Sequence, residues 1–215
     1  MDFIGPFVKS GGYDTVMTIT DRSSGHVRIL PTTSTATTAK QIAELFFTGW
    51  FPTFGIPMEI ICDRDKIFMS KFWKTMFKLL KVDIKASTAY HPQTDGSSER
   101  TNKTVIQLLR NHVDRHQQGW EKALPLIEFQ INNSMNTSTG KAPFELSLLY
   151  RPRIIPSIDP TSIGETNVPA AVDLVKTLKK TLDDAKDNLI AAKARQQLKL
   201  ISITELRMHT LLGTL

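Results

Sequence analysis

The amino-acid sequence predicts a protein of the α/β or α+β class with a mixed sheet, and three observations support this. Residues 1–31 contain three apolar, β-branched stretches separated by turn residues, which is the pattern of an antiparallel meander. Residues 36–86 then alternate between helical and strand spacing. Residues 168–200 repeat apolar side chains in steps of three and four, which predicts one long amphipathic helix.

Composition limits the classes of protein that this chain can represent. Its 215 residues and 40% hydrophobic content suit one packed core domain with an appendage. The net charge of +6 favours a polyanionic partner. The single cysteine, Cys62, excludes an intramolecular disulfide, and its place in an apolar run predicts a small core residue. No apolar run is long enough to span a membrane, and no signal peptide is recognised.

The first third of the chain predicts the meander. Strands are expected at Asp2–Phe7, Thr15–Thr20 and His26–Leu30, because each stretch is apolar or β-branched. The intervening Ser10–Gly12 and Asp21–Gly25 are rich in residues that favour turns. Neighbouring strands joined in this way are expected to pair antiparallel.

The middle of the chain predicts helices and strands in alternation. A helix is expected over residues 36–54, followed by a short buried strand at Met58–Cys62. A second helix over Ser70–Lys81 leads into a fifth strand at Val82–Ala86. A further helix is expected from about Ser97 to His116, after a loop that contains proline and glycine.

The chain is expected to divide into four parts. Residues 1–150 form the core domain, and the Pro-rich residues 151–167 form a linker. Residues 168–200 form the long helix, which needs a partner surface on its own core or on another subunit, and a coiled-coil contact is an alternative. Residues 201–215 form a tail of different character.

Three carboxylates lie in a predicted strand, at the end of another and at the start of a predicted helix. Asp63 follows the fourth strand, Glu99 opens the helix after the loop, and 35 residues separate the two. Asp2 lies within the first apolar run. Mg²⁺ prefers such hard oxygen ligands. Two ions about 3.5–4 Å apart can activate a nucleophile and stabilise the leaving oxygen of a phosphodiester.

This spacing, with the sequence His-Pro-Gln-Thr-Asp-Gly ahead of Glu99, resembles the catalytic core of retroviral-type integrases. In particular it is similar to the integrase of Ty3/gypsy-type long-terminal-repeat retrotransposons, over about residues 1–155. The resemblance implies a ribonuclease H-like α/β fold, with a five-stranded mixed sheet flanked by helices and the long helix added at the C-terminal side. It also implies that the first and fourth strands adjoin, which would bring Asp2 beside Asp63.

The resemblance also implies a function. Asp2, Asp63 and Glu99 would be the catalytic residues and would hold two Mg²⁺ (or Mn²⁺) ions. The expected reactions are trimming of the 3′ end of the element's DNA and attack of the new hydroxyl on target DNA, which together integrate a retrotransposon. Partners would be the element ends, target DNA and further copies of the chain, and the place of action would be the nucleus.

Five residues are expected to contact DNA by the same resemblance. They are Tyr90, Asp95, Arg100, Asn102 and Lys103. The loop from Tyr90 to residue 96 carries a proline and a glycine, so it is expected to be a movable gate, with an ordinary surface turn as the alternative.

Two other functions stay open at the level of sequence. The chain departs from the family in having no His-His-Cys-Cys zinc site, which one cysteine cannot supply, and it looks truncated at both ends. These departures favour a catalytically inactive remnant that binds nucleic acid or self-associates. A ribonuclease H-like nuclease would use the same three acids, and activity on RNA–DNA hybrids would distinguish it.

Overall fold

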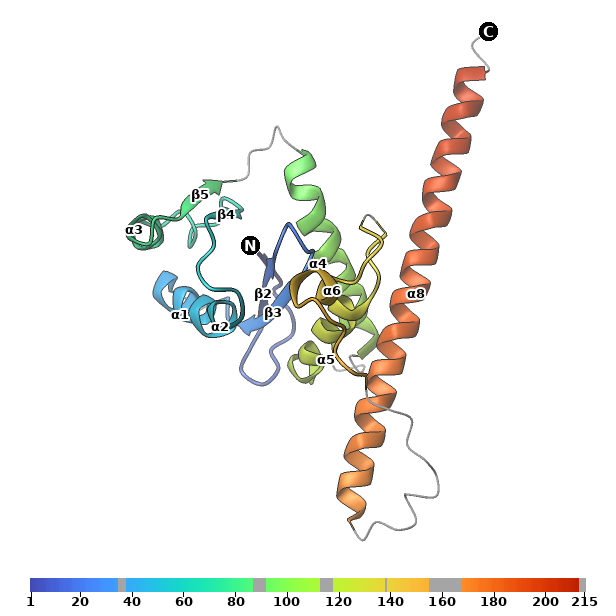
Figure 1. Cartoon of the computed structure of the whole chain (residues 1–215), viewed down its shortest axis with the longest axis horizontal. Coiled ribbons are helices and arrows are strands. Elements are labelled where there is room, and N and C mark those ends of the chain that lie inside the picture. The colour runs from blue at the N-terminus through green and yellow to red at the C-terminus, as the bar shows by residue number, and fades with distance from the viewer. Residues whose placement is uncertain (35–37, 87–91, 113–117, 138, 155–167, 213–215) are drawn as a thin grey trace. The chain divides into compact units, whose positions relative to one another are not determined.

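The structure is a computed structural model that describes residues 1–34, 38–86, 92–112, 118–137, 139–154 and 168–212. The chain divides into two compact units, Met1–Ile155 and Pro156–Leu215, and each is described by itself. Figure 1 labels the helices and strands of both. The strands and the predicted site residues all belong to the first unit.

Three short strands form the first sheet in the order β1-β2-β3, and both pairings are antiparallel. The strands are β1 (Asp2–Ile4), β2 (Thr15–Thr20) and β3 (Val27–Thr32). The turn after β2 is held by the Asp21 carboxylate, which accepts hydrogen bonds from the backbone N–H and hydroxyl groups of Ser23 and Ser24. The predicted meander is therefore confirmed, with a first strand shorter than expected.

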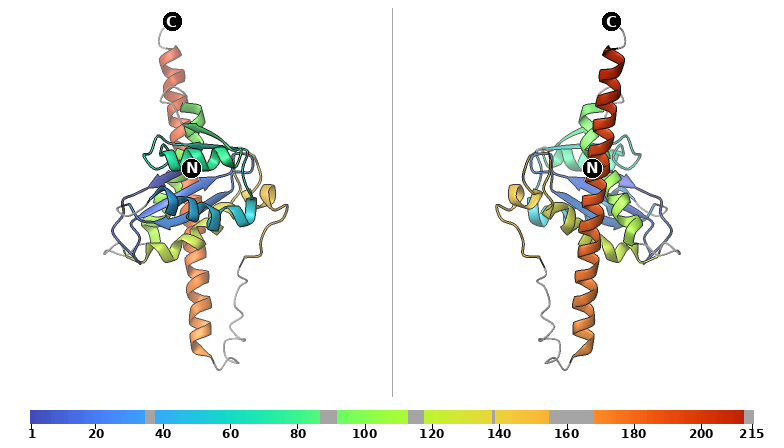
Figure 2. Two further views of the ribbon diagram at one scale, coloured as in Figure 1. Left: turned by 90° about the vertical axis from the view of Figure 1, so that its left-hand side faces the viewer. Right: turned by 90° about the vertical axis from the view of Figure 1, so that its right-hand side faces the viewer.

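Two helices cover one face of this sheet, as the left view of Figure 2 shows. Helix α1 (Ala39–Gly49) begins at a capping box in which Thr38 and Gln41 bond each other's backbone N–H. Helix α2 (Phe51–Phe54) follows after Trp50. The expectation of one helix over residues 36–54 is wrong in this respect, because Pro52 lacks the N–H that would continue α1.

A second, two-stranded sheet follows in the chain. Strands β4 (Glu59–Cys62) and β5 (Asp83–Ala86) pair in parallel, and helix α3 (Lys71–Leu79) connects them. The hydroxyl of Ser70 caps α3 by accepting a hydrogen bond from Trp73 N–H. The apolar face of α3 then joins α1 in a core that includes Phe46, Trp73 and Phe77, all at most 1% exposed.

The five strands form two sheets rather than the one continuous sheet that was expected. No ladder between β1 and β4 forms among the described residues. The N-terminal ammonium of Met1 does donate a hydrogen bond to the Ile61 carbonyl at 2.7 Å, so the two sheets adjoin. Phe3 and Phe68 stack at a centroid distance of 4.9 Å beside this junction. Because β1 has three residues, it offers few backbone groups for a second ladder.

Helix α4 (Pro92–His112) begins five residues before the expected Ser97, which corrects that boundary. A proline at the first helical position loses no intrahelical bond, and its fixed φ suits a helix start. Gly96 therefore lies inside the helix, although glycine lowers helix stability by about 1 kcal/mol. Of the expected gate loop, residues 87–91 lie outside the described part of the chain.

Helices α5 (Trp120–Asn133) and α6 (Pro143–Ser147) complete the first unit, and α5 covers the outer edge of β3. Figure 1 shows β2 and β3 between α1 on one side and α4 with α5 on the other. Asn132 accepts a hydrogen bond from Val27 N–H and donates one to the Val27 carbonyl, both at 2.8 Å. Glu128 accepts from Ile29 N–H at 2.7 Å. Side chains of α5 thus supply the partners that a further strand would give an edge strand.

In the second unit the described residues form helix α8 (Pro169–Leu212). It continues through most of the expected tail, 201–215, because residues 201–212 contain good helix formers and no glycine or proline. The expected end at residue 200 is therefore wrong. Within the expected linker, residues 155–167 lie outside the described residues. None of the described helices is long and apolar enough to cross a membrane.

Candidate functional site

Asp2 lies on β1 and is held by three elements of the fold. Its Oδ1 accepts a hydrogen bond from Phe3 N–H at 2.8 Å, and its Oδ2 accepts one from the Asn102 side-chain amide of α4. The amide oxygen of Asn102 in turn accepts from the Thr18 hydroxyl of β2 at 2.9 Å. A chain of hydrogen bonds from Thr18 through Asn102 therefore fixes the Asp2 carboxylate and ties α4 to the first sheet.

Thr18 is a functional candidate that the sequence analysis did not include. It is 3% exposed and lies directly opposite Asp2 in the β1–β2 register. Directly opposed residues of antiparallel strands have neighbouring side chains. The sequence analysis would have identified Thr18 if it had aligned the first two predicted strands so that Asp2 faces Thr18. The length of the turn between these strands does not by itself determine that alignment. Asn102 was expected to contact DNA, and the structure adds that it orients Asp2.

Asp63 directly follows β4 and is exposed. The residue before it, Cys62, is 1% exposed and belongs to the core, as expected. Burial raises the pKa of the Cys62 thiol, although the N-terminal ammonium of Met1 and the ammonium of Lys74 act in the opposite direction. Cys62 therefore stays a neutral thiol at physiological pH.

Glu99 lies on the exposed side of α4, with 66% of its side chain accessible. Its carboxylate accepts a hydrogen bond from Lys103, four residues later, at 2.8 Å. Residues three and four apart share a helix face. Glu99 is three residues before Asn102, so it lies about 5 Å along the helix axis from the residue that contacts Asp2.

The structure brings some of the predicted site residues together and leaves others apart. Asp2 meets Asn102, and Glu99 meets Lys103. Within the described part of the chain, no group of three or more His, Cys, Asp or Glu residues is close enough to hold a metal ion. The three acids thus belong to neighbouring elements but do not form a closed cluster.

The remaining predicted DNA contacts are only partly described. Arg100 is exposed on α4, and its carbonyl accepts a hydrogen bond from the Thr104 hydroxyl. The backbone of Asp95 is helical in α4. Tyr90 lies outside the described residues. Arg100 and Lys103 therefore add two cations to the same half of α4 that carries Glu99.

The donor chemistry of these acids fits a divalent cation. Carboxylate oxygens are the ligands that Mg²⁺ takes, usually one or two of them together with water and phosphate oxygens. Asp2 offers a carboxylate whose orientation is already fixed by Asn102 and Phe3 N–H. Lys103 balances the charge of Glu99 in its present position, so this carboxylate is paired but remains accessible.

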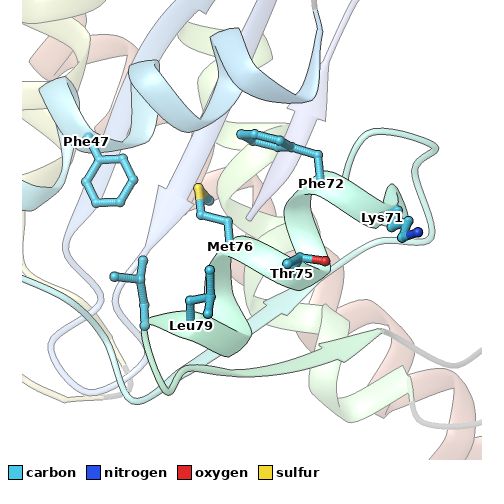
Figure 3. Close-up of a pocket in the computed structure, with 7 residues that line it drawn as sticks. Phe47, Lys71, Phe72, Thr75, Met76 and Leu79 are labelled. Atoms are coloured by element: carbon cyan, nitrogen blue, oxygen red, sulfur yellow. The ribbon is translucent and has the colours of Figure 1, made fainter.

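A separate apolar hollow of about 640 Å³ lies between α1 and α3 (Figure 3). Phe47 of α1 faces Met76 and Leu79 of α3 across it. Lys71, the one charged residue among those that line it, extends away at its far end. Among the residues that the structure describes, no predicted site residue lines this hollow, so it is distinct from the acidic site.

Comparison with known proteins identifies relatives of this chain. No protein-family model matches it. The transposon Tf2-3 and Tf2-4 polyproteins of Schizosaccharomyces pombe are each 34% identical to it over 207 residues, which is 95% of this chain. The chain spans 15% of the length of these polyproteins.

Solved structures with a similar fold are integrases. A simian T-cell lymphotropic virus intasome in complex with PP2A regulatory subunit B56 gamma contains a chain that aligns with a TM-score of 0.58, at 20% identity, over 74% of this chain and 57% of that one. The HTLV-2 integrase catalytic core domain in complex with magnesium aligns with a TM-score of 0.54, at 17% identity, over 68% of this chain and 93% of that one.

The BIV integrase catalytic core domain is a third such structure, with a TM-score of 0.52 and 17% identity over 69% of this chain and 92% of that one. These likenesses extend the resemblance seen in the sequence to the fold itself. The chain is homologous to a segment of the Ty3/gypsy-type Tf2 transposon polyproteins, and it has the fold of a retroviral-type integrase catalytic core.

Proposed function

We propose that this chain is an integrase-type catalytic core that processes DNA 3′ ends and transfers DNA strands with the help of divalent cations. The observation that carries the proposal is the hydrogen bond from Asn102 to Asp2, which holds α4 against β1. It keeps Glu99 within one helical turn of the Asp2 contact. The homology to transposon polyproteins supports the same reading.

The junction of the two sheets supports a place for Asp63 in the same site. The Met1 N–H meets the Ile61 carbonyl at 2.7 Å. If a parallel ladder continued from that bond, Asp2 would stand opposite Asp63. Opposed residues in a sheet have Cβ atoms about 4.5–5.5 Å apart, so a metal ion could bridge two such carboxylates.

In the proposed mechanism Asp2, Asp63 and Glu99 would hold Mg²⁺ or Mn²⁺, two ions in the active complex. When bound, these ions would activate the attacking oxygen and stabilise the leaving oxygen. Asn102 donates to Asp2 Oδ2, and Thr18 donates to Asn102, so the orientation of this ligand is fixed before substrate arrives.

The cations of α4 position the DNA in this proposal. Lys103 pairs with Glu99 and is 69% exposed, so its ammonium group is accessible to a DNA phosphate. Arg100 is exposed beside it and adds a donor for the backbone of the element end. Contacts of this kind fix register and carry no base specificity. Asn102, Asp95 and Tyr90 are the other residues proposed to approach DNA.

Partners and a place of action are also part of this proposal. One structural neighbour is a viral intasome, and the HTLV-2 core was solved in trimeric and dimeric forms. We therefore propose that this chain acts on DNA as a homo-oligomer, and on chromosomal DNA in the nucleus.

The test is Mn²⁺-dependent disintegration of a branched DNA substrate by the full chain. We expect product from the wild type, and at least a 100-fold lower rate from Asp63→Asn and from Glu99→Gln, because each change removes a metal ligand. Glu44→Gln is the matched control, since Glu44 is an exposed carboxylate on α1. Equal rates for the Asp63 and Glu44 variants would refute the assignment.

A second candidate function is a nucleic-acid-binding or self-associating module without catalysis. It is favoured by the pairing of Glu99 with Lys103 and by the lack of a three-acid cluster among the described residues. Retention of duplex DNA binding together with no disintegration product in Mg²⁺ or Mn²⁺ would establish it.

A further inference from the structure

A basic hollow lies between α3 and β5, on a part of the first unit that the proposed mechanism does not use. Its volume is about 350 Å³. The residues that line it are Lys74, Lys78, Lys81, Val82, Asp83 and Ile84. Three ammonium groups thus share one concave surface with one carboxylate. We refer to Lys74, Lys78, Lys81 and Asp83 together as the α3 hollow.

The lysines of the α3 hollow share it with Asp83 but are not held in close ion pairs in the described part of the chain. Lys74 and Lys78 are four residues apart on α3, where like charges destabilise a helix slightly. The first turn of α3 also lacks an acidic residue and begins with Lys71, which opposes the helix dipole. Lys78, in contrast, lies in the last turn of α3, where the helix dipole favours a cation, so the local cost falls on the N-terminal part of the helix.

Lys81 shows a second local cost. Its φ is 57°, in the left-handed region that favours glycine. Lys81 N–H bonds the Lys78 carbonyl and Val82 N–H bonds the Phe77 carbonyl, which is the Schellman pattern at the end of a helix. Glycine is the common residue at that position. A lysine here adds strain and also adds the third ammonium group of the hollow.

The α3 hollow lies along the β4–β5 sheet (Figure 1). Asp83, at the start of β5, pairs with Glu59 at the start of β4, whereas Asp63 follows the opposite end of β4. Lys81 and Asp83 therefore lie at the end of this sheet away from Asp63. The hollow is thus a cationic surface separate from Arg100 and Lys103, which belong to α4.

We propose that the α3 hollow binds phosphates of a duplex DNA backbone, outside the carboxylate site. Lys74 and Lys78 are about 6 Å apart along the helix axis. Each strand of duplex DNA carries one charge per about 3.4 Å of its axis, so this spacing spans about two phosphates. Lysine binds phosphate as a point charge and selects no base. The choice of DNA as the ligand rests on the proposed function.

The test is the salt dependence of binding of a fluorescent 30-base-pair duplex by the full chain, measured by anisotropy in EDTA. Each phosphate contact contributes about 0.9 to the slope of log K against log salt. We expect the double variant Lys74→Gln/Lys78→Gln to lower that slope by about 1.8. The matched control is Lys40→Gln/Lys141→Gln, two exposed lysines on other parts of the first unit. Equal slopes for the two double variants would overturn the proposal.

Two further variants separate binding from folding. Asp83→Asn removes the carboxylate from the hollow, so we expect it to bind the duplex more tightly, by about 2–5-fold at low salt. Lys81→Gly relieves the left-handed strain and should raise the unfolding midpoint by about 2–4 °C while weakening DNA binding. A Lys81→Gly protein that is more stable and binds DNA as the wild type does would contradict the role of Lys81.

Competition distinguishes the source of the phosphate. Tripolyphosphate binding that the Lys74→Gln/Lys78→Gln variant loses, without loss of duplex binding, would assign the hollow to a small anion and overturn the proposal. Binding in EDTA does not depend on the metal site. Suppose that the wild type gives no disintegration product, while Lys74→Gln/Lys78→Gln still lowers the slope of log K against log salt by about 1.8. This result would refute the proposed function and leave the proposal for the α3 hollow intact.

Discussion

The two ends of the first sheet are held in different ways. At the β3 edge, Asn132 and Glu128 of α5 bond three backbone groups of Val27 and Ile29 at 2.7–2.8 Å. At the β1 end, no ladder to β4 forms among the described residues. The β3 edge is therefore completed by side chains of α5, whereas the contacts between the two sheets include the Met1–Ile61 hydrogen bond and the stacking of Phe3 on Phe68. The proposed metal ions would lie at this second junction.

Removing the α5 contact should give the largest effect. Asn132→Ala leaves the N–H and carbonyl of Val27 without partners in a buried place, and each buried unpaired group costs about 1–3 kcal/mol. We expect a loss of about 2–4 kcal/mol in the free energy of unfolding, measured in urea. Gln107→Ala, an exposed position on α4, is the control and should change stability by less than about 0.5 kcal/mol. Similar losses for both variants would refute the assigned role of Asn132.

Lowering the pH should destabilise the β3 edge of the first sheet through His26, which directly precedes β3. Burial lowers the pKa of His26 from 6.5 to about 4, and Arg28 acts in the same direction. Between these values the unfolded chain binds more protons than the folded one, so this contribution is complete above about pH 6.5 and is lost as the pH falls towards 4. We expect His26 to account for a loss of up to about 3 kcal/mol in unfolding free energy.

The comparison that isolates this effect is His26→Asn against the wild type, by urea unfolding at pH 7 and pH 4.5. The wild type should lose more stability than the variant over this interval. Equal losses would mean that other groups cause the acid sensitivity.

Substitutions at the β1 end of the sheet, beside Asp2, should reduce stability less than Asn132→Ala does. Thr18→Val removes the hydroxyl that donates to Asn102, and we expect a loss of about 1 kcal/mol together with a lower disintegration rate, because Asn102 then holds Asp2 less firmly. Thr18→Ser keeps the hydroxyl and should retain most of the activity. If Thr18→Val and Thr18→Ser have equal rates, the hydrogen-bond chain does not position Asp2.

The sequence predicted the order of elements well because each carries a local signal. The meander follows from β-branched runs and turns, and α3 follows from the helical spacing of apolar residues over Ser70–Lys81. Long-range features were not predictable in this way. The split of the five strands into two sheets depends on how many backbone groups β1 can offer to β4, and the periodicity of the strands contains no information on that.

The candidate site shows the same division. Spacing and resemblance identified Asp2, Asp63 and Glu99, and their placement as a metal site stays a prediction. The role of Asn102 in holding Asp2 required the packing of α4 on β1, and Thr18 required the strand register. The early start of α4 was missed because Pro92 was interpreted as a helix breaker, whereas proline is favoured at the first helical position.

The most direct test of the account is thermal unfolding with and without Mg²⁺ or Mn²⁺, for the wild type, Asp63→Asn and the control Glu44→Gln. A ligand that binds only the folded state at about ten times its dissociation constant stabilises it by roughly 1.4 kcal/mol, or about 3–6 °C for a chain of this size. We predict that rise for the wild type and for Glu44→Gln, and none for Asp63→Asn. The same rise in Asp63→Asn, or no rise in the wild type, would contradict a metal site at the junction of β1 and β4.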